Sequence, residues 1–243
     1  MAYVLILGAS SDVAIACGQE FAKNGYDLYL AGRDMAVLEA RAADFQIRHQ
    51  VKAKAIAFDA LEFEQHAGFY LALDPQPEIT ICVFGLLGNQ AESEKNWTEC
   101  KKVIDSNYTG AVSILNYVAN DYEAKQKGTI VGVSSVAGER GRQSNYIYGS
   151  AKAGFTAYLS GLRNRMVSSG VHVVTVKPGF IYTKMTEGLK LPKQITAEPG
   201  DLGGAIFKAV KRRKNIIYVL PIWRLIMLII RTVPEGMFKK LKL

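Results

Sequence analysis

The sequence predicts an α/β fold in which a single parallel β-sheet, with about seven strands, is covered by helices on both faces. Short apolar segments alternate with longer amphipathic segments along the chain, which is the pattern of alternating strands and helices. The short segments are apolar on both faces, which indicates strands buried between two helical layers, as in parallel sheets. We therefore expect one doubly wound domain of the Rossmann type.

The predicted elements follow in regular order. The first strand covers Tyr3–Leu7, and the glycine turn at Gly8 leads into a helix that ends near Asn24. The remaining strands are predicted at Asp27–Ala31, Ala53–Phe58, Ile79–Val83, Thr129–Val133, Val171–Val176 and Ile216–Val219. Helices are predicted from Asp34, from Glu62, through Tyr122, over Tyr148–Ser168 and near Asp201–Arg212. Since no linker is visible, residues 1–220 are expected to form the Rossmann-type domain and residues 221–243 a basic amphipathic C-terminal appendage.

Composition is that of a globular chain. Of the 243 residues, 49% are hydrophobic and 21% are charged, which supplies a core and argues against disorder. The three cysteines lack the paired spacing of metal motifs and the three histidines are scattered, so no metal site is expected. The N-terminal residues lack the basic and apolar regions of a signal peptide. We expect a cytoplasmic protein with reduced thiols.

The net charge of +8 is unevenly distributed along the chain. Residues 202–243 contain ten lysines and arginines and one acid, which gives +9 and leaves the remaining 20 basic and 21 acidic residues at −1. A uniformly basic protein would suggest a nucleic-acid partner. The basic residues of this chain are concentrated at one end, so no nucleic-acid partner is expected. A neutral body with a basic, apolar end favours contact with a membrane surface or an anionic partner.

A candidate proton-transfer site lies between Gly132 and Gly154. Tyr148 and Lys152 are four residues apart, so on a helix they lie one turn apart on the same face. A nearby ammonium lowers the pKa of a phenol, which makes it a better acid or base at neutral pH. Ser135, at the end of a predicted strand, could bring its hydroxyl to the same substrate oxygen.

The turn after the first strand is the expected phosphate site. A strand, a glycine turn and a helix start point backbone N–H groups and the positive helix end at a diphosphate. Only Gly8 remains of the usual three glycines, and Asp12 and Ala14 occupy the later positions. Asp12 could cap the helix, and its charge should point away from a diphosphate.

The end of the second strand selects the cofactor. A carboxylate there would bind the ribose diol of NAD, whereas a basic residue accommodates the phosphate of NADP. The sequence has Gly32 followed by Arg33, whose planar guanidinium suits a phosphate. We expect a preference for NADPH, with Ser10 as a second phosphate contact, while NAD remains an alternative. A solvated arginine at a helix start is the other interpretation.

These residues belong to a larger set that extends along nearly the whole chain. The set comprises Gly8-Ala-Ser-Ser, Asp59, Asn107 in Ser-Asn-Tyr-Thr-Gly, Ser135, Tyr148-x-x-x-Lys152, Pro178-Gly179 and Thr183. In this order the chain resembles the classical short-chain dehydrogenases/reductases. It departs from that family after the fourth strand, where Cys82-Val-Phe-Gly85 replaces the usual Asn-Asn-Ala-Gly.

The resemblance implies catalytic roles. Tyr148 would protonate the carbonyl oxygen as hydride arrives, and Ser135 would hydrogen-bond that oxygen. Lys152 would bind the nicotinamide ribose and lower the pKa of Tyr148, while Asn107 would hold a water that links Lys152 to solvent. An inert relative that binds the cofactor without reaction is the alternative.

The resemblance also implies a cofactor site. Asp59 would contact the adenine amino group, Ala60 would flank the base, and the Ile181 backbone and the Thr183 hydroxyl would hold the carboxamide. The cofactor residues expected are Gly8, Ser10, Ser11, Asp12, Val13, Arg33, Asp59, Ala60, Phe84, Gly85, Tyr148, Lys152, Pro178, Gly179, Ile181 and Thr183.

A narrower resemblance concerns the substrate. The segments Phe84–Gly88, Ala137–Arg142, Ser144–Gly149 and the end from Val233 are similar to those of decaprenylphosphoryl-2-keto-ribose reductases, which carry an acid at the position of Asp12. This resemblance implies reduction of a polyprenyl-phosphate-linked keto-sugar in cell-wall biogenesis. The substrate contacts expected are Arg140, Arg142 and Tyr146.

The appendage combines apolar and basic residues. The apolar segment Ile216–Ile230 is broken by Pro221 and Arg224, so it is too short for a spanning helix. A short helix is predicted from Trp223 to Arg231, followed by Met237, Phe238, Leu241 and Leu243 interleaved with Lys239, Lys240 and Lys242. This composition favours peripheral contact with anionic lipid at the inner face of the plasma membrane. A tail packed over the active site or on a partner subunit is the alternative.

Two other functions remain open from the sequence. The chain could be a short-chain reductase of another lipid-like or small-molecule ketone, or a catalytically silent NADP-binding sensor. A homo-oligomer, formed as a homodimer through helices near Asn107–Tyr122 and Tyr148–Ser168, is expected from the family resemblance alone.

Overall fold

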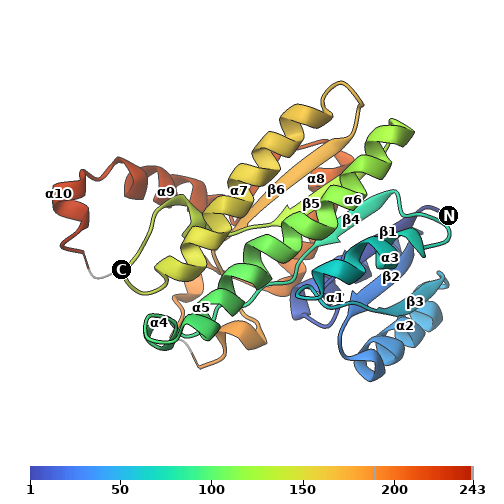
Figure 1. Cartoon of the computed structure of the whole chain (residues 1–243), viewed down its shortest axis with the longest axis horizontal. Helices are drawn as coiled ribbons and strands as arrows, with labels where there is room; N and C mark the ends of the chain where they lie inside the picture. Colours follow the sequence, from blue (N-terminus) through green and yellow to red (C-terminus); the bar gives the residue numbers. More distant parts are fainter. Residues whose placement is uncertain (189, 242–243) are drawn as a thin grey trace.

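The fold is built on one seven-stranded parallel sheet. The computed structural model describes residues 1–188 and 190–241, so Lys242 and Leu243 of the predicted tail lie outside the described residues. The strand order is β3-β2-β1-β4-β5-β6-β9, and every neighbouring pair is parallel. The strands are β1 (Tyr3–Leu7), β2 (Asp27–Gly32), β3 (Ala53–Ala57), β4 (Ile79–Cys82), β5 (Thr129–Val133), β6 (His172–Pro178) and β9 (Ile216–Val219). The predicted doubly wound α/β fold is confirmed (Figure 1).

Helices cover both faces of the sheet. They are α1 (Asp12–Lys23), α2 (Met35–His49), α3 (His66–Leu71), α4 (Gln90–Ser93), α5 (Trp97–Ile104), α6 (Gly110–Lys125), α7 (Tyr146–Met166), α8 (Pro199–Lys211), α9 (Ile222–Thr232) and α10 (Glu235–Phe238). Buried side chains of α1, α2 and α8 form one core cluster with the sheet, and those of α3, α6 and α7 form a second. In β1, Val4 and Ile6 enter the first cluster while Tyr3, Leu5 and Leu7 enter the second. This two-sided burial explains why the strand sequence is apolar throughout.

The strand order reverses beside β1, which has β2 on one side and β4 on the other. The chain therefore leaves β1 and β4 in opposite directions, and a crevice opens outside their carboxyl ends. Ligands of open α/β sheets bind at such a switch point.

One helix differs from the sequence prediction in a way that matters for the site. The helical stretch predicted through Tyr122 divides into α5, five π-helical residues (Asp105–Thr109) and α6. The wider turn holds Asn107, which is buried. Such π-helical turns occur frequently at functional sites.

A second small sheet follows β6 and was absent from the prediction. Strands β7 (Phe180–Ile181) and β8 (Thr196–Ala197) pair in parallel, and the segment between them carries two short 3₁₀ turns at Lys184–Thr186 and Lys193–Ile195. Two-residue strands have no hydrophobic period to detect. This segment forms one wall of the site described below.

The C-terminal elements lie at the end of the molecule opposite the N-terminus (Figure 1). The predicted domain boundary at residue 220 falls between β9 and α9. Trp223 and Met227 of α9 are buried in a third cluster with Val136, against Phe180 and Ile195. Within residues 1–188 and 190–241, no helix combines the length and apolar character needed to cross a bilayer.

Candidate active site

Two adjoining cavities occupy the crevice at the switch point. The first, of ≈ 260 Å³, contains Ser135, Tyr148 and Lys152, and the second, of ≈ 320 Å³, contains Arg33 and Asp59. Ser11, Val83, Gly85 and Met185 line both cavities. A single extended ligand could therefore occupy the two together.

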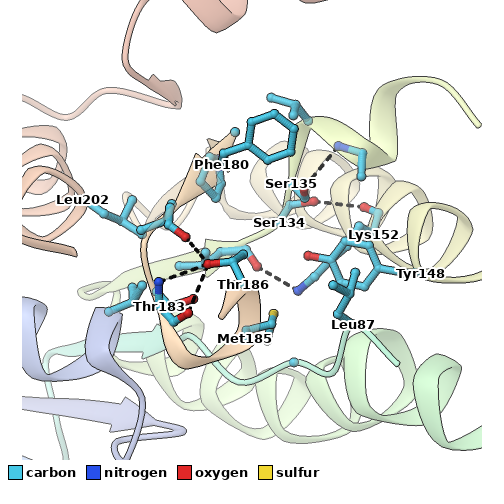
Figure 2. Close-up of a pocket in the computed structure, with 18 of the residues that line it drawn as sticks. Leu87, Ser134, Ser135, Tyr148, Lys152, Phe180, Thr183, Met185, Thr186 and Leu202 are labelled. Carbon is cyan, nitrogen blue, oxygen red and sulfur yellow. Dashed lines mark hydrogen bonds between the residues drawn. The ribbon is translucent and has the colours of Figure 1, made fainter. Parts of the chain in front are cut away.

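The three predicted catalytic side chains converge on the first cavity. Figure 2 shows Ser135 at the end of β5 and Tyr148 and Lys152 on α7, across the cavity from Thr183 and Met185. The Ser135 hydroxyl accepts a hydrogen bond from the N–H of Ala137 at 3.1 Å, which fixes its orientation at the start of a 3₁₀ turn.

Ser134 connects the strand that carries Ser135 to the helix that carries Lys152. Its hydroxyl donates to the Lys152 carbonyl at 3.0 Å and lies 2.6 Å from the Thr156 hydroxyl. Because Ser134 is buried, these bonds hold β5 and α7 in one register. Ser134 was not among the predicted site residues, although it stands beside Ser135.

Burial sets the titration of the catalytic pair. It raises the pKa of the Tyr148 phenol to about 12, against the opposing effect of a hydrogen bond with Ser135. It lowers the pKa of the Lys152 amine to about 8. The Lys152 Nζ lies 5.8 Å from the centre of the Tyr148 ring and donates to the Val133 carbonyl at 3.1 Å. The pKa of Tyr148 is thus raised by burial and not lowered by Lys152, contrary to the expectation from the family resemblance.

Asn107 supports the site from behind rather than lining it. Its Nδ2 donates to the carbonyls of Leu86 at 2.6 Å and Val103 at 2.8 Å, and its Oδ1 accepts from the Leu86 N–H at 3.3 Å. These bonds clamp the segment that replaces the usual Asn-Asn-Ala-Gly motif. A Cβ at Gly85 would lie 2.6 Å from Asn107 Oδ1 and 3.3 Å from Lys152 Nζ, so only glycine fits there.

The turn after β1 has the shape expected of a phosphate site. Gly8 has φ +89°, and a Cβ there would lie 2.8 Å from Phe84, so glycine is required both for conformation and for space. Ser11, not Asp12, caps α1, by accepting from the Ala14 N–H at 3.2 Å. Asp12 is the first helical residue and its Oδ2 instead accepts from the Lys184 N–H at 3.1 Å, which ties the turn to the segment after β7.

The predicted cofactor residues divide between the two cavities. The second cavity contains Gly8, Ser10, Ser11, Arg33, Asp59, Ala60, Phe84 and Gly85. The first contains Ser11, Asp12, Val13, Gly85, Tyr148, Lys152, Pro178, Gly179, Ile181 and Thr183. Since every predicted residue lines at least one cavity, the chain offers a continuous surface that fits a dinucleotide.

The segment after β6 is held by threonines. The Thr186 hydroxyl donates to the Ile181 carbonyl at 2.6 Å, and the N–H of Thr183 donates to the Thr186 hydroxyl at 3.1 Å. The Ile181 carbonyl thus has a partner within the chain, whereas Thr183 lines the first cavity. Figure 2 shows this turn facing Tyr148 and Lys152.

Comparison with known proteins identifies the family. The family model described as short chain dehydrogenase matches residues 2–194. The chain belongs to the short-chain dehydrogenase/reductase family. It is accordingly an oxidoreductase that uses NAD(P)H to interconvert CH–OH and C=O groups.

Individual relatives share this family over nearly their whole length. An uncharacterized oxidoreductase of Streptomyces coelicolor is 30% identical over 98% of this chain and 95% of its own, and one of Mycobacterium tuberculosis is 28% identical over 98% and 96%. A short-chain dehydrogenase from Sphingobium yanoikuyae, solved in complex with NADPH, superimposes with a TM-score of 0.83 at 24% identity, covering 99% of this chain and 96% of that chain. At 24% identity, this structural similarity shows a shared fold alone.

The three predicted substrate residues have different positions in this short-chain dehydrogenase. Arg142 lines the first cavity, and its Nη2 lies 3.3 Å from the Met227 sulfur. Its buried Nε has no hydrogen-bond partner among the described residues, and burial lowers the pKa of the guanidinium. Arg142 is therefore the substrate candidate that the fold brings to the cavity.

Arg140 binds the C-terminal tail and lines neither described cavity, and its contact with a substrate phosphate stays a prediction. Its Nη1 donates to the carbonyls of Ile230 and Val233, both at 2.6 Å, and its Nη2 pairs with Glu235 at 2.9 Å. The guanidinium also lies 3.7 Å from the centre of the Phe238 ring. Its donors are committed to the tail. Tyr146 begins α7, is 45% exposed and lines neither described cavity, and its contact with the substrate likewise stays a prediction.

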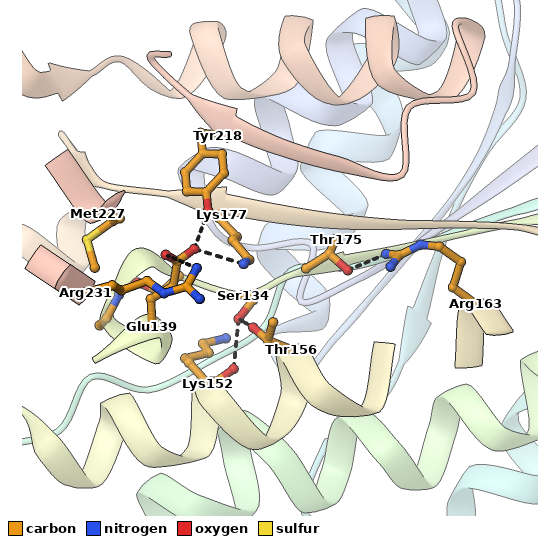
Figure 3. Close-up of polar contacts among 12 residues, drawn as sticks. Ser134, Glu139, Lys152, Thr156, Arg163, Thr175, Lys177, Tyr218, Met227 and Arg231 are labelled. Atoms are coloured by element: carbon orange, nitrogen blue, oxygen red, sulfur yellow. Dashed lines mark hydrogen bonds and ion pairs between the residues drawn. The ribbon is translucent and has the colours of Figure 1, made fainter. Parts of the chain in front are cut away.

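A buried ionic cluster beside the site escaped the sequence analysis. Figure 3 shows Glu139, in the 3₁₀ turn after Ser135, accepting from Lys177 of β6 and Tyr218 of β9. The Lys177 Nζ lies 2.8 Å from Glu139 Oε1, and Arg231 of α9 lies 3.9 Å from Oε2. The available signal was Lys177, because a lysine in an otherwise apolar strand needs a buried partner.

No candidate metal centre accompanies the site. Among the residues that the structure describes, no three histidine, cysteine, aspartate or glutamate side chains come together as a metal site would require. The polar side chains that line the first cavity include the predicted catalytic residues and Arg142.

Proposed function

We propose that the protein is an NADPH-dependent reductase of a ketone on a polyprenyl-phosphate-linked sugar, acting in cell-envelope glycan synthesis. The observation that carries the proposal is the first cavity, where Tyr148, Ser135 and Lys152 stand at one position and the guanidinium of Arg142 at another. Such a cavity suits a ligand that has both a reducible carbonyl and an anionic group. The sugar class itself rests on the sequence resemblance.

The roles of the residues follow from their chemistry. Bound nicotinamide supplies hydride to the carbonyl carbon. Tyr148 has a pKa of about 12 and is protonated at neutral pH, so it can donate its proton to the developing alkoxide. Ser135 stabilises the same oxygen by a hydrogen bond. Lys152 would hold the ribose hydroxyls, and the Asn107 carboxamide keeps the Gly85–Leu86 backbone in place behind them.

The choice of NADPH rests on Arg33 and Ser10. Both are exposed and line the second cavity, where the adenosine ribose would lie. Neither side chain makes a hydrogen bond to another described residue, and a guanidinium suits a phosphate. The NADPH in the Sphingobium yanoikuyae structure supports the same choice.

A second ketone class is favoured by the apolar lining. Leu87, Val136, Phe180, Met185 and Leu202 line the first cavity, and such walls would equally accept another lipid-like or small-molecule ketone. Turnover measured with defined substrates distinguishes a lipid-linked keto-sugar from these other ketones. If the protein binds NADPH but turns over no ketone, a catalytically silent NADP-binding sensor would be favoured.

The experiment follows NADPH oxidation with a polyprenyl-phosphate keto-pentose and with soluble bulky ketones. Tyr148→Phe should lower kcat about 10²–10⁴-fold, because it removes the general acid, while NADPH binding measured by fluorescence stays unchanged. Turnover of neither ketone class by the wild type, with intact NADPH binding, would overturn the reductase proposal.

A matched pair of variants tests the substrate class. Arg142→Ala should raise KM for the lipid-linked keto-sugar about tenfold or more and leave KM for an uncharged ketone unchanged, because only the former has an anion to bind. Equal effects on both substrates would favour the second ketone class.

The remaining parts of the proposal concern the setting. We place the enzyme in the cytoplasm, with its lipid-linked substrate at the inner face of the plasma membrane. A homodimer through α6 and α7 is proposed from the family resemblance, and residues 1–220 are proposed as the NADP-binding catalytic domain. Sedimentation of the purified chain tests the dimer.

A further inference from the structure

Helix α9 is apolar on two faces, and only one of them has a partner. On the inner face, Trp223 and Met227 are 3% and 0% exposed. On the outer face, apolar side chains remain open to solvent, with exposed fractions of 43% for Ile222, 54% for Leu225, 59% for Leu228 and 57% for Ile229. A helix that was only part of the core would carry polar residues on this second face.

The short helix α10 and Leu241, three residues after its end, add further exposed apolar side chains. Met237 is 64% exposed and Leu241 is 47% exposed. We define the tail surface as Ile222, Leu225, Leu228, Ile229, Met237 and Leu241. Exposed apolar residues gathered in one short segment mark an interaction site more often than scattered ones do.

Basic residues accompany the tail surface. Residues 221–241 contain four basic residues (Arg224, Arg231, Lys239, Lys240) and one acid (Glu235), a net charge of +3. Lys239 and Lys240 are exposed and follow α10 directly. Glu235 is already paired with Arg140, so its charge is largely neutralised.

The other basic residues of the C-terminal segment lie elsewhere. Lys208 and residues 211–214 precede β9 at its amino end, whereas the cavities lie at the carboxyl ends of the strands. The charge of +9 in the sequence is thus divided between two ends of the sheet, and only the part on the tail accompanies the exposed apolar residues.

We propose that the tail surface docks on an anionic lipid bilayer. At 1.5 Å per residue, the 11 residues of α9 reach roughly 16 Å, about half of a hydrocarbon core of roughly 30 Å, so the helix lies in the interface rather than across it. Apolar side chains would enter the acyl boundary while Arg224, Lys239 and Lys240 meet anionic headgroups. If a second copy of the chain docked there instead, two tails that each carry a net charge of +3 would face and repel one another.

The tail surface is fixed relative to the active site by the inner face of the same helix. The Trp223 Nε1–H donates to the Ile195 carbonyl at 2.9 Å, and a Cβ at Gly179 would lie 1.9 Å from the Trp223 ring. Arg140 holds the carbonyls at the end of α9. Docking would therefore bring the end of the sheet that carries the cavities to the lipid. The orientation itself is argued from these contacts. Only its functional advantage, access of the active site to a lipid-linked substrate, rests on the proposed function.

The test is flotation of the full chain with vesicles of phosphatidylcholine, with and without phosphatidylglycerol. The wild type should float with the anionic vesicles and be released by high salt. The double variant Leu225→Glu, Leu228→Glu should lower the bound fraction about tenfold or more, because both apolar contacts become repulsive. Ile47→Glu, at a 79% exposed apolar residue of α2, is the matched control and should float like the wild type.

Other results would overturn the proposal. They are failure of the wild type to float, equal loss in the control, or a dimer in sedimentation that the double variant dissociates, which would assign the tail surface to a second copy. Tyr148→Phe should float normally, and the double variant should reduce a soluble ketone at the wild-type rate. Vesicle binding without turnover would thus contradict the reductase proposal and still support the docking proposal.

Discussion

Lys152 is a buried ammonium whose charge depends on pH near the physiological range. Burial lowers the pKa of its amine to about 8 from an ordinary value of 10.5, and Ser134 and Val133 hold its backbone and its Nζ. The amine is charged below about pH 8 and neutral above it. Below that pH its ammonium can donate hydrogen bonds to the ribose hydroxyls of a bound nicotinamide cofactor.

This titration predicts the pH profile of the free enzyme. The kcat/KM for NADPH should fall about tenfold per pH unit above pH 8, because kcat/KM reports groups of the free enzyme. Steady-state rates of NADPH oxidation between pH 6 and about 10 measure it. Lys152→Arg keeps its charge throughout, so its lower rate should not decline in that range. A wild-type profile that stays level to pH 10 contradicts the assignment.

Arg33 predicts cofactor discrimination. Arg33→Ala should raise KM for NADPH about tenfold or more, since a charge-assisted contact to phosphate is lost, and leave KM for NADH unchanged. Both values come from initial rates with a fixed ketone. Arg48→Ala is a suitable control, because that exposed arginine of α2 pairs with Asp44 and lines neither described cavity. An equal effect of Arg33→Ala on both cofactors would assign Arg33 a structural role.

Most single residues of the candidate site could be predicted from the sequence, because their spacing is local. Tyr148 and Lys152 share a helix face, and Ser135 ends a strand whose apolar character is plain. Arg140 and Arg142 could not be distinguished, because the partners of Arg140 lie about 90 residues further along the chain. Their separation required the position of the tail.

At the scale of elements, hydrophobic periodicity placed all seven strands of the main sheet and most helices, with ends displaced by a few residues. The π-helical turn at Asp105–Thr109 escaped prediction because it repeats the helical pattern with one extra residue. Strands β7 and β8 escaped because strands of two residues have no hydrophobic period to detect.

Arg140 links two elements, and its removal should loosen the tail helix. Arg140→Ala leaves the carbonyls of Ile230 and Val233 without their donor, which should cost about 1–3 kcal/mol and lower Tm by about 2–12 °C. Thermal unfolding followed by circular dichroism measures the change. Arg48→Ala is the control, because that exposed arginine pairs with Asp44 within α2. Equal Tm for both variants would contradict the clamp.

At the scale of the whole molecule, the C-terminal tail is bound into the fold. Residues 221–241 contribute no lining to the first cavity. It nevertheless packs behind that cavity, where Trp223 covers Gly179 and Met227 touches Arg142. The Glu139 cluster joins the loop after Ser135 to β6, β9 and α9 (Figure 3).

This arrangement predicts that residues 1–220 are less stable than the full chain. Trp223→Ala empties a fully enclosed site, since Trp223 is 3% exposed, and should lower the free energy of unfolding by about 3–5 kcal/mol. Truncation after Leu220 removes Met227 and the Arg140 contacts as well and should cost more. Urea unfolding of both variants measures the losses. If the truncated chain unfolded at the wild-type midpoint, residues 1–220 would be an independent domain and the tail a mere appendage.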